Sequence, residues 1–322
     1  MILAGDIGGT KTVLAICDAE LAIVRDATFR SAEHASLDAI LDAFVRPGER
    51  GDLTAACFGV AGPVVDGTAH ITNLPWTIDS KAISTRLSGI PVTLINDLQA
   101  TALGTLVLPA SAFCVLQAAP AVAGGTIAVI APGTGLGEAL LVAFDGSYRA
   151  LPSEAGHADF APGTDDEIAL LRHLHDLHGD HVSYERVLSG AGLGDLYDFV
   201  REHTGSDSAL PAGERNAAIS HAALDRSDPA AVRALDMFVE ILGAEAGNLA
   251  LRGLATGGVV LGGGIPPKIL PALQHPRFIE RFNAKGRFAP WTRGLAVRVA
   301  LEPRAALLGA AHHAATHKDA RP

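Results

Sequence analysis

The chain has 322 residues, of which 48% are hydrophobic and 19% are charged, so it is long and apolar enough to fold as one large or two ordinary domains. Acidic residues exceed basic residues by ten and no run of lysines and arginines occurs, which argues against nucleic acid and against an anionic membrane surface as partners. No apolar run reaches the ~18 residues of a membrane helix, and the first residues lack the basic region of a signal peptide, so the sequence predicts a cytoplasmic protein.

The N-terminal segment "MILAGDIGGTKTVLAICD" has the pattern of a β-hairpin. An apolar strand leads to a Gly8-Gly9 turn, and a second strand covers residues 12–17. An amphipathic helix follows at residues 37–44 ("LDAILDAF"), and a short buried strand at residues 91–95. Strands that first pair locally and then alternate with helices predict an α/β domain.

Asn96 and Asp97 follow that strand directly, at a strand-to-helix corner, because Leu98, Ala102 and Leu106 lie at helical spacing. Asn and Asp are preferred N-cap residues, so the pair could serve only to begin a helix. The alternative is that the carboxylate of Asp97 takes part in chemistry.

A second hairpin pattern occurs at residues 126–146, "TIAVIAPGTGLGEALLVAFDG". The spacing from Gly8 to Asp18 equals that from Gly135 to Asp145, ten residues in each case. Chance similarity between two hairpins is one explanation. A duplicated hairpin also predicts a two-lobed fold built from repeated α/β domains.

The rest of the chain is mainly helical. "DDEIALLRHLHDLHG" is amphipathic, with acidic residues in its first turn, and Pro229 opens a long helix that ends near residue 252. Residues 257–270 predict a buried strand that ends in a triple-glycine loop. The Ala-rich segment "EPRAALLGAAHHAAT" predicts a final helix.

Three glycine-rich turns each follow an apolar strand, and each could be a plain hairpin turn or loop. None fits a P-loop, and "GTGLGE" has Glu138 where GxGxxG needs its last glycine. Glycines in a turn do let backbone N–H groups approach phosphate closely, so two facing hairpins could hold a polyphosphate. Asp6, beside the first turn, could orient magnesium through water.

Acidic residues and a histidine are found in two later segments. "LPSEAGHADFAP" contains Glu154, His157 and Asp159, and "SYERVLSGAGL" contains Glu185. These side chains could bond one another, or bind a metal, although they lack the HExxH spacing of a zinc site. They could also bind vicinal hydroxyls of a polyhydroxy ligand, and Asn96 and Asp97 would complete such a ring.

Three cysteines, Cys17, Cys57 and Cys114, lie among apolar neighbours without CxxC spacing. This pattern predicts buried, reduced thiols and neither a disulfide framework nor a zinc site.

Several segments, in this order, resemble the bacterial glucokinase family over nearly the whole chain: "GDIGGTKTVLAICD", "INDLQATALG", "APGTGLG", "LPSEAGHADFAP", "SYERVLSGAGL", "AGNLAL" and "VVLGGGIPP". The resemblance implies a two-lobed actin-like, ribonuclease H-like ATPase fold with duplicated phosphate hairpins. It also implies ATP- and magnesium-dependent phosphorylation of glucose at its 6-hydroxyl, and a cytoplasmic homodimer that acts in glycolysis.

The resemblance also implies roles for single residues. Asp97 matches the family's catalytic base and Asn96 its sugar-binding neighbour. Glu154, His157 and Glu185 match residues that hold the remaining sugar hydroxyls. The first turn matches the ATP-binding turn, so the expected nucleotide-binding residues are Gly5, Asp6, Ile7, Gly8, Gly9, Thr10, Gly133, Thr134, Gly135, Gly263 and Gly264.

One departure concerns the first turn, which reads "GGTKT", as in a broader kinase family that also contains sugar-kinase-like repressors. That family carries a cysteine-rich zinc motif soon after its "GH", whereas "GHADFAPGTDDE" contains no cysteine. The narrower glucokinase group is therefore preferred. A small domain is expected at residues 1–107 plus 303–322 and a large domain at residues 108–302.

Two other functions stay open from the sequence. The first is a kinase for another hexose, such as mannose, fructose or an amino sugar. The second is a non-enzymatic sugar-sensing protein on the same fold, against which an intact Asp97 argues.

Overall fold

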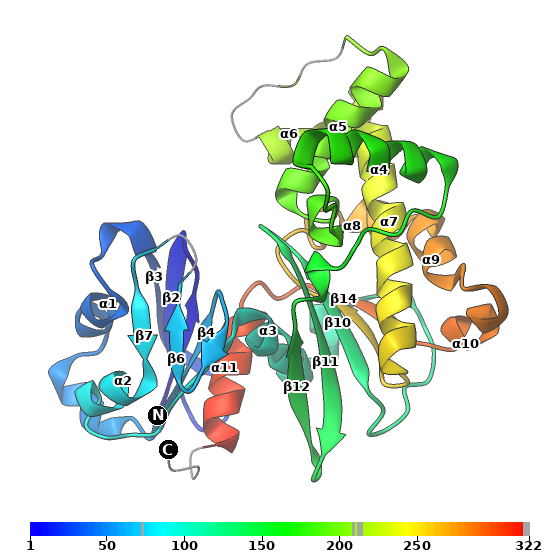
Figure 1. Ribbon diagram of the computed structural model, residues 1–322. Helices are drawn as coiled ribbons and strands as arrows, with labels where there is room; N and C mark the ends of the chain where they lie inside the picture. Colours follow the sequence, from blue (N-terminus) through cyan, green and yellow to red (C-terminus); the bar gives the residue numbers. More distant parts are fainter. Residues whose placement is uncertain (72–73, 208–209, 211–214, 318–322) are drawn as a thin grey trace. The chain divides into compact units, whose positions relative to one another are not determined.

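The computed structural model describes residues 1–71, 74–207, 210 and 215–317, and the chain forms two compact units (Figure 1). The first unit comprises residues 1–110, 148–152 and 302–322, and the second comprises residues 111–147 and 153–301. Residues 148–152, which the sequence assigns to the large domain, group with the first unit, although they lie on β12 (Ser147–Ser153), a strand of the second unit's sheet.

The first unit is built on a five-stranded sheet. Its strand order is β3 (Ile23–Arg30), β2 (Lys11–Cys17), β1 (Ile2–Ile7), β4 (Ala55–Val60) and β8 (Val92–Asn96). β1 pairs with β2 antiparallel and with β4 parallel, and β4 pairs with β8 parallel. All residues of β4 are buried, as expected for a central strand covered on both faces.

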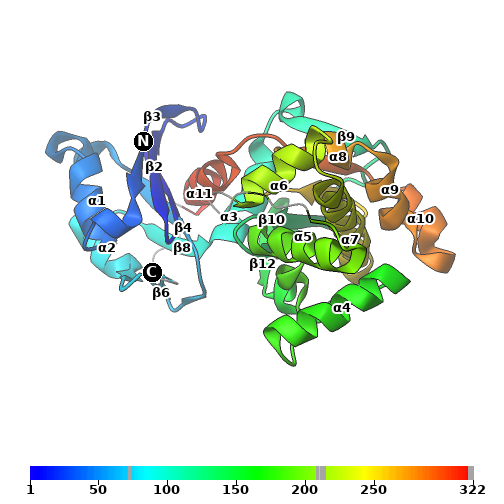
Figure 2. The ribbon, with the colours of Figure 1, turned by 90° about the horizontal axis from the view of Figure 1, so that it is seen from above.

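Helices cover both faces of this sheet. α1 (Leu37–Phe44) and α2 (Ser80–Arg86) lie on one side, and α3 (Asp97–Val107) and α11 (Ala305–Thr316) on the other (Figures 1 and 2). The helices predicted at residues 37–44 and near the C-terminus are confirmed. Shorter elements of the unit are β5 (Val64–Val65), β6 (Thr68–His70), β7 (Thr77–Asp79), η1 (Ser31–Glu33) and η2 (Pro47–Asp52), and η3 (Ala110–Ala112) lies at the boundary between the two units in the chain.

The second unit repeats the arrangement. Its sheet has the order β12 (Ser147–Ser153), β11 (Leu136–Phe144), β10 (Ile127–Pro132), β13 (Gly258–Leu261), β14 (Val297–Ala300) and β9 (Phe113–Gln117). β10 pairs with β11 antiparallel and with β13 parallel, as β1 does with β2 and β4. The hairpin similarity in the sequence therefore reflects a duplicated sheet topology, as predicted.

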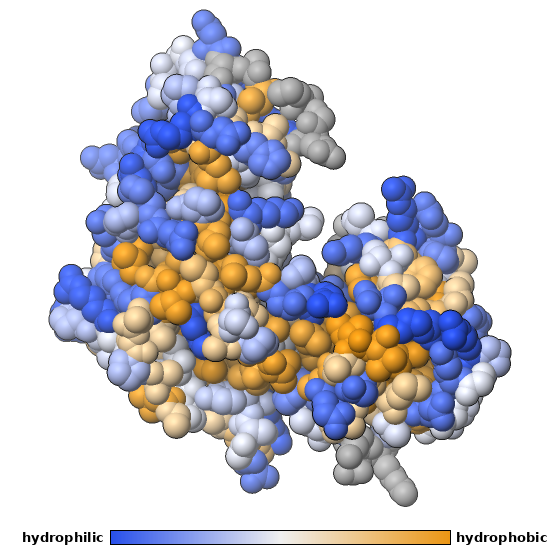
Figure 3. Space-filling view, turned by 180° about the vertical axis from the view of Figure 1, so that it is seen from behind, coloured by the Kyte–Doolittle hydropathy of each residue, from blue (hydrophilic) through white to orange (hydrophobic). Residues whose placement is uncertain are grey.

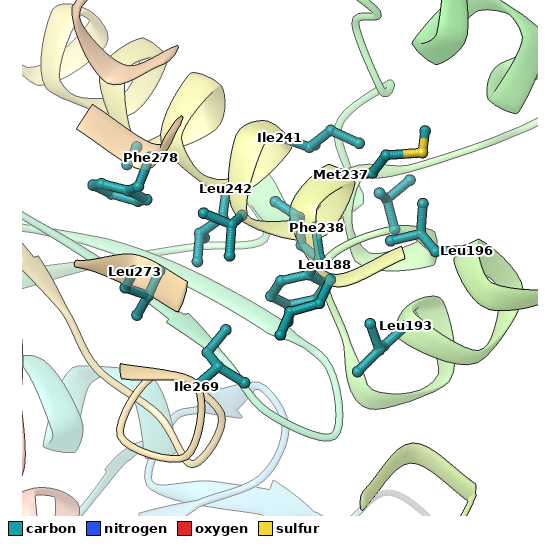
Figure 4. Packing of buried hydrophobic residues seen from close by; sticks show 14 of the residues in the cluster. Leu188, Leu193, Leu196, Met237, Phe238, Ile241, Leu242, Ile269, Leu273 and Phe278 are labelled. Carbon is teal, nitrogen blue, oxygen red and sulfur yellow. The ribbon is translucent and has the colours of Figure 1, made fainter. Parts of the chain in front are cut away.

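The long helix α7 (Pro229–Gly253) is the centre of the second unit. Asp228 caps it by accepting the N–H groups of Ala230 and Ala231, and Pro229 occupies its first position, where a missing N–H costs nothing. Its apolar side chains pack against residues of several neighbouring elements (Figure 4). The labelled residues are Leu188, Leu193, Leu196, Met237, Phe238, Ile241, Leu242, Ile269, Leu273 and Phe278.

Further helices surround α7. They are α4 (Asp165–His178), α5 (Gly190–Thr204), α6 (Arg215–Leu224), α8 (Leu270–Leu273), α9 (Pro276–Asn283) and α10 (Ala289–Arg293), with the short η4 (Ala155–His157), η5 (Tyr184–Arg186) and η6 (Gly286–Phe288). None of the helices within the described ranges is long and apolar enough to cross a membrane.

The prediction of three buried thiols is partly wrong. Cys17 and Cys57 are buried, but Cys114 is only partly buried, because its strand β9 is the edge strand of its sheet. Burial raises the pKa of the Cys17 thiol to about 11 and that of Cys57 to about 12. Neither is therefore a thiolate nucleophile at neutral pH.

Candidate active site

Asn96 and Asp97, at the corner between β8 and α3, have different roles at the start of the helix. Asn96 is the N-cap: its Oδ1 accepts the Leu98 N–H at 2.9 Å, and its backbone N–H is accepted by Gln99 Oε1 at 3.0 Å, which completes a capping box. Its Nδ2 donates to the carbonyl of Gly62 at 3.3 Å. Asp97 is the first helical residue, where the helix dipole favours a negative charge.

Close packing holds the start of α3 in place. A Cβ on Gly104 of α3 would lie 1.9 Å from the carbonyl oxygen of Ala305, and one on Gly309 of α11 would lie 1.8 Å from that of Ala100. A Cβ on Gly59 of β4 would lie 2.8 Å from the Cβ of Ala100. α3 is therefore wedged against both α11 and β4 through residues with little or no side chain, which fixes the position of Asp97.

The first glycine turn joins β1 to β2. Gly5 and Ile7 are buried strand residues, and a Cβ on Gly5 would lie 2.5 Å from Phe58, so both could reach a ligand only through their backbone. Gly8, Gly9 and Thr10 form the turn itself, which the Gly8 N–H closes by donating to the Lys11 carbonyl at 2.9 Å.

Asp6 precedes this turn on β1. Burial raises the pKa of its carboxyl, and the nearby Lys11 ammonium lowers it. A carboxylate that burial destabilises is one that a cation would stabilise, so Asp6 fits the expected link to magnesium.

The second glycine turn joins β10 to β11 and is bound by Glu185. Oε2 of Glu185 accepts the Leu136 N–H at 2.9 Å, and a Cβ on Gly135 would lie 2.4 Å from the same oxygen. The Gly190 N–H, at the start of α5, donates to the Gly133 carbonyl at 2.9 Å. A residue expected to bind sugar thus touches a turn expected to bind nucleotide.

The other expected sugar ligands of the second unit lie beside Glu185. The backbone N–H of His157 donates to the Glu154 carbonyl at 3.0 Å, and its Nδ1 lies 4.0 Å from Oε1 of Glu185. A Cβ on Gly156 would lie 2.0 Å from the Leu136 carbonyl oxygen, so the backbone at Gly156 packs closely against the end of the second turn. The structure therefore brings Glu154, His157 and Glu185 together, and places Asn96 and Asp97 together in the other unit.

Glu138, on β11 after the second turn, has a buried carboxyl. Burial and the neighbouring Glu245 raise the pKa of Glu138 to about 8, against the opposing effect of Arg252. Glu245 is fully buried and pairs with Arg252. The site thus favours a protonated Glu138, whose two carboxyl oxygens are buried and accept no hydrogen bond from the described residues.

A cavity of about 560 Å³ lies within the second unit, next to the second turn. Polar groups come from α6 and from the loop after β13, and the floor includes Leu193 and Ile269 of the core seen in Figure 4. The lining residues are Gly133, Thr134, Gly190, Ala191, Leu193, Asn216, Ala217, Ser220, His221, Gly264, Ile265, Lys268 and Ile269. The cavity fits a ligand with a flat apolar part and a polar or anionic part, because it combines apolar walls with the N-terminus of α5.

The triple-glycine loop forms one edge of this cavity. Gly263 has φ +80°, and a Cβ there would lie 2.5 Å from the Pro132 carbonyl, so the loop and the second turn meet at a distance that only glycine allows. Gly264 lines the cavity with nothing near its missing side chain.

The contribution of α6 and Lys268 to this cavity was not predicted from the sequence. Asn216, Ser220 and His221 belong to no motif, and the spacing of α6 indicates only a short amphipathic helix. The only indication of this cavity in the sequence is the triple-glycine loop, because glycines often occur where the backbone closely approaches a ligand or another strand.

Comparison with known proteins is consistent across sequence and structure. A family profile described as Glucokinase matches residues 3–317. A curated glucokinase of Trichormus variabilis is 37% identical over 334 residues, covering 97% of this chain and 98% of the relative. The crystal structure of a glucokinase from an Antarctic psychrotroph is similar with a TM-score of 0.85 and 34% identity, over 97% of this chain and 99% of the other.

A more distant solved structure shares the fold. It is a ROK family glucokinase from Streptomyces griseus in complex with glucose and AMPPNP, with a TM-score of 0.66 and 23% identity, over 98% of this chain and 99% of the other.

Proposed function

The chain belongs to the glucokinase family, and from this premise we propose which of its residues carry out the reaction. It has the actin-like ATPase fold and is an enzyme that phosphorylates glucose with ATP. The assignment of residues rests mainly on the contact between Glu185 and the second glycine turn. This contact connects a proposed sugar-binding residue with a proposed nucleotide-binding turn within one unit.

Asp97 is the proposed general base. Its carboxylate accepts the proton of the glucose 6-hydroxyl while that oxygen forms a bond to the γ-phosphorus and the bond from the γ-phosphorus to the β-phosphate oxygen breaks. The products are glucose 6-phosphate and ADP. Such base assistance contributes typically ~10²–10⁴-fold to a rate. The capping box of Asn96 and the packing of α3 support this role, since both fix the position of the carboxylate.

The sugar is bound by Asn96, Glu154, His157 and Glu185, together with Asp97. Carboxylates accept hydrogen bonds from vicinal hydroxyls, and the amide of Asn96 has a second N–H besides the one that Gly62 accepts. This set suits a polyhydroxy ligand such as a hexose, and the proximity of His157 to Glu185 supports a shared role of these two side chains in binding it.

The nucleotide is bound by both glycine turns and by the cavity. The N–H groups of the first turn hold the terminal phosphates, Gly133 to Gly135 and the start of α5 hold the phosphates from the second unit, and the adenosine occupies the cavity. Asp6 would orient, through water, the magnesium bound with ATP, and this ion would neutralise charge on the phosphates.

The enzyme is proposed to be a cytoplasmic homodimer that supplies glucose 6-phosphate to glycolysis. Hydrophobic patches lie on the surface of each unit in the view from behind (Figure 3), and patches of this kind are where subunits associate. Large apolar residues exposed among the described positions include Val115, Phe144, Leu177 and Phe288.

A coupled assay that detects ADP tests the substrate. We expect turnover with D-glucose to exceed turnover with mannose, fructose or an amino sugar. Faster turnover of another hexose would reassign the substrate but leave the kinase chemistry in place.

A second experiment tests the cavity. Gly264→Leu places a side chain into the cavity, so the KM for ATP should rise at least about tenfold while the KM for glucose changes little. Gly51→Leu is the control, because a Cβ at Gly51 would also meet nothing within 4 Å and Gly51 belongs to the first unit. An unchanged KM for ATP in Gly264→Leu would contradict the assignment of the cavity.

A further inference from the structure

Ser31, at the start of η1, is fully buried and contacts the first glycine turn from behind. Its Oγ donates to the Gly8 carbonyl at 2.8 Å, and its backbone N–H donates to the Thr10 carbonyl at 3.1 Å. A second buried hydroxyl, that of Thr12, lies 3.0 Å from Ser31 Oγ. Ser31 belongs to none of the motifs of the sequence.

The direction of these bonds follows from counting hydrogens. A serine hydroxyl has one hydrogen, and Ser31 gives it to the Gly8 carbonyl. The Thr12 hydroxyl must then be the donor to Ser31 Oγ. The result is a one-way chain from Thr12 through Ser31 to Gly8, buried from water and without a charged member.

This chain determines which way one peptide group of the turn faces. The Gly8 carbonyl and the Gly9 N–H belong to the same planar peptide and point in opposite directions. When Ser31 binds the carbonyl, the Gly9 N–H must point away from Ser31. Within the described part of the chain, no protein group accepts the N–H of Gly9 or of Thr10.

Without the hydrogen bond from Ser31, the Gly8–Gly9 peptide group could rotate to the opposite orientation. It lies between two glycines, and glycine reaches alternative backbone conformations at little steric cost. A reversed peptide would present the Gly8 carbonyl, a negative dipole, where a phosphate needs a donor.

We propose that Ser31 is a positioning residue for phosphoryl transfer, which keeps the Gly8–Gly9 peptide turned so that the Gly9 N–H faces the phosphate of ATP. This inference rests on the proposed role of the first turn in binding phosphate. Ser31 itself does not touch the nucleotide; it acts through the backbone of the turn.

Steady-state kinetics of Ser31→Ala tests the proposal. Loss of one hydrogen bond to a charged group corresponds to roughly a tenfold effect, so kcat/KM for ATP should fall about tenfold. The KM for glucose should change less than about twofold, because glucose does not contact the turn. Thr12→Val removes only the outer hydroxyl and should give a smaller change of the same kind.

Ser84→Ala is the matched control. Ser84 is also a serine of the first unit whose hydroxyl donates to a backbone carbonyl, that of Ile90 at 2.6 Å, but it does not contact the turn. It should lower the thermal midpoint about as much as Ser31→Ala does and leave the kinetics for ATP unchanged. Equal kinetic effects in the two variants, or an unchanged kcat/KM for ATP in Ser31→Ala, would overturn the proposal.

A third variant separates this inference from the proposed function. Gly9→Pro removes the N–H in question, and its folding is checked by its thermal midpoint. If folded Gly9→Pro binds and uses ATP normally, the first turn does not hold phosphate and the proposed function of the turn fails. If Gly9→Pro loses ATP affinity while Ser31→Ala does not, the turn keeps its role and only the positioning role of Ser31 is wrong.

Discussion

The two glycine turns have the same place in two sheets of the same topology, yet they are supported by different chemistry. Behind the first turn are neutral hydroxyls, those of Thr12 and Ser31. The second turn is held by the carboxylate of Glu185, and the buried carboxyl of Glu138 follows it on β11. Hydroxyl groups do not titrate near neutral pH, so their contacts with the first turn are insensitive to pH. A carboxyl group can be protonated, and Glu185 is also a proposed sugar-binding residue.

The same difference holds for the two units as a whole. Among the described residues, the most buried polar side chains of the first unit are the hydroxyls of Thr12, Ser31 and Thr105, and the carboxyl of Asp6 is less completely buried. Those of the second unit include the acids Glu138, Glu167, Asp228 and Glu245. The two units therefore share a sheet topology but differ in their buried polar side chains. Four predictions test what these differences do.

The largest expected difference between the units is chemical, because the proposed base lies in the first. Asp97→Asn keeps the shape of the side chain but removes the base, so kcat should fall at least ~10²-fold with a much smaller change in the KM for glucose. Asp79→Asn is the control, since Asp79 caps α2 of the same unit and Asn caps equally well. A near-normal kcat in Asp97→Asn would leave Asp97 as a structural residue only.

Helix packing should matter for catalysis only in the first unit. Gly104→Ala puts a methyl group 1.9 Å from the Ala305 carbonyl and must shift α3, at a cost of about 1–3 kcal/mol. Gly243→Ala in α7 makes a similar overlap with the Phe278 carbonyl, at 2.3 Å. Both should lower the thermal midpoint, but only Gly104→Ala should also lower kcat, because α3 carries Asp97. Equal loss of kcat in both would mean that general destabilisation explains it.

Glu185 should couple the sugar and nucleotide sites within the second unit. Glu185→Gln removes the charge that accepts the Leu136 N–H, so the KM for glucose should rise about tenfold and the KM for ATP by a smaller factor. Asp159→Asn, a change of the same kind at an exposed residue of the neighbouring segment, should alter neither constant. A change in the KM for glucose alone would show that the contact with the turn carries no coupling.

The smallest expected effect concerns pH. The pKa of Glu138 is about 8 in the folded chain and near 4.5 when unfolded, so the unfolded state releases the proton first. The stability that Glu138 contributes is complete below about pH 4.5 and is lost as the pH rises through 8. Gln resembles the protonated acid, so the thermal midpoint of Glu138→Gln relative to the parent should rise between pH 5 and pH 9.

Thr12→Val supplies the comparison for the first unit. Its effect on the thermal midpoint should be the same at every pH, because a hydroxyl does not titrate in this range. The contrast would be wrong if the difference in thermal midpoint between Glu138→Gln and the parent did not change with pH, or if that for Thr12→Val did.

Much of the fold could be predicted from local patterns. The hairpins, the helices at residues 37–44 and 165–178, the long helix from Pro229 and the final helix follow from apolar spacing and from capping residues, and the structure has them where expected. The duplication was visible because both hairpins keep the same spacing from glycine to aspartate. The burial of Cys114 was predicted wrongly, since its local sequence does not show that its strand lies at the edge of a sheet.

The sequence by itself determined most of the elements and those candidate site residues that lie in contiguous motifs, because strand, helix and turn preferences act over a few neighbouring residues. Only the tertiary structure decided what supports them. Ser31 meets Gly8 across 23 positions of the chain, and Glu185 meets Leu136 across 49. Such contacts depend on how the sheets and helices pack, and no local preference of a serine or a glutamate records which distant peptide it will hold.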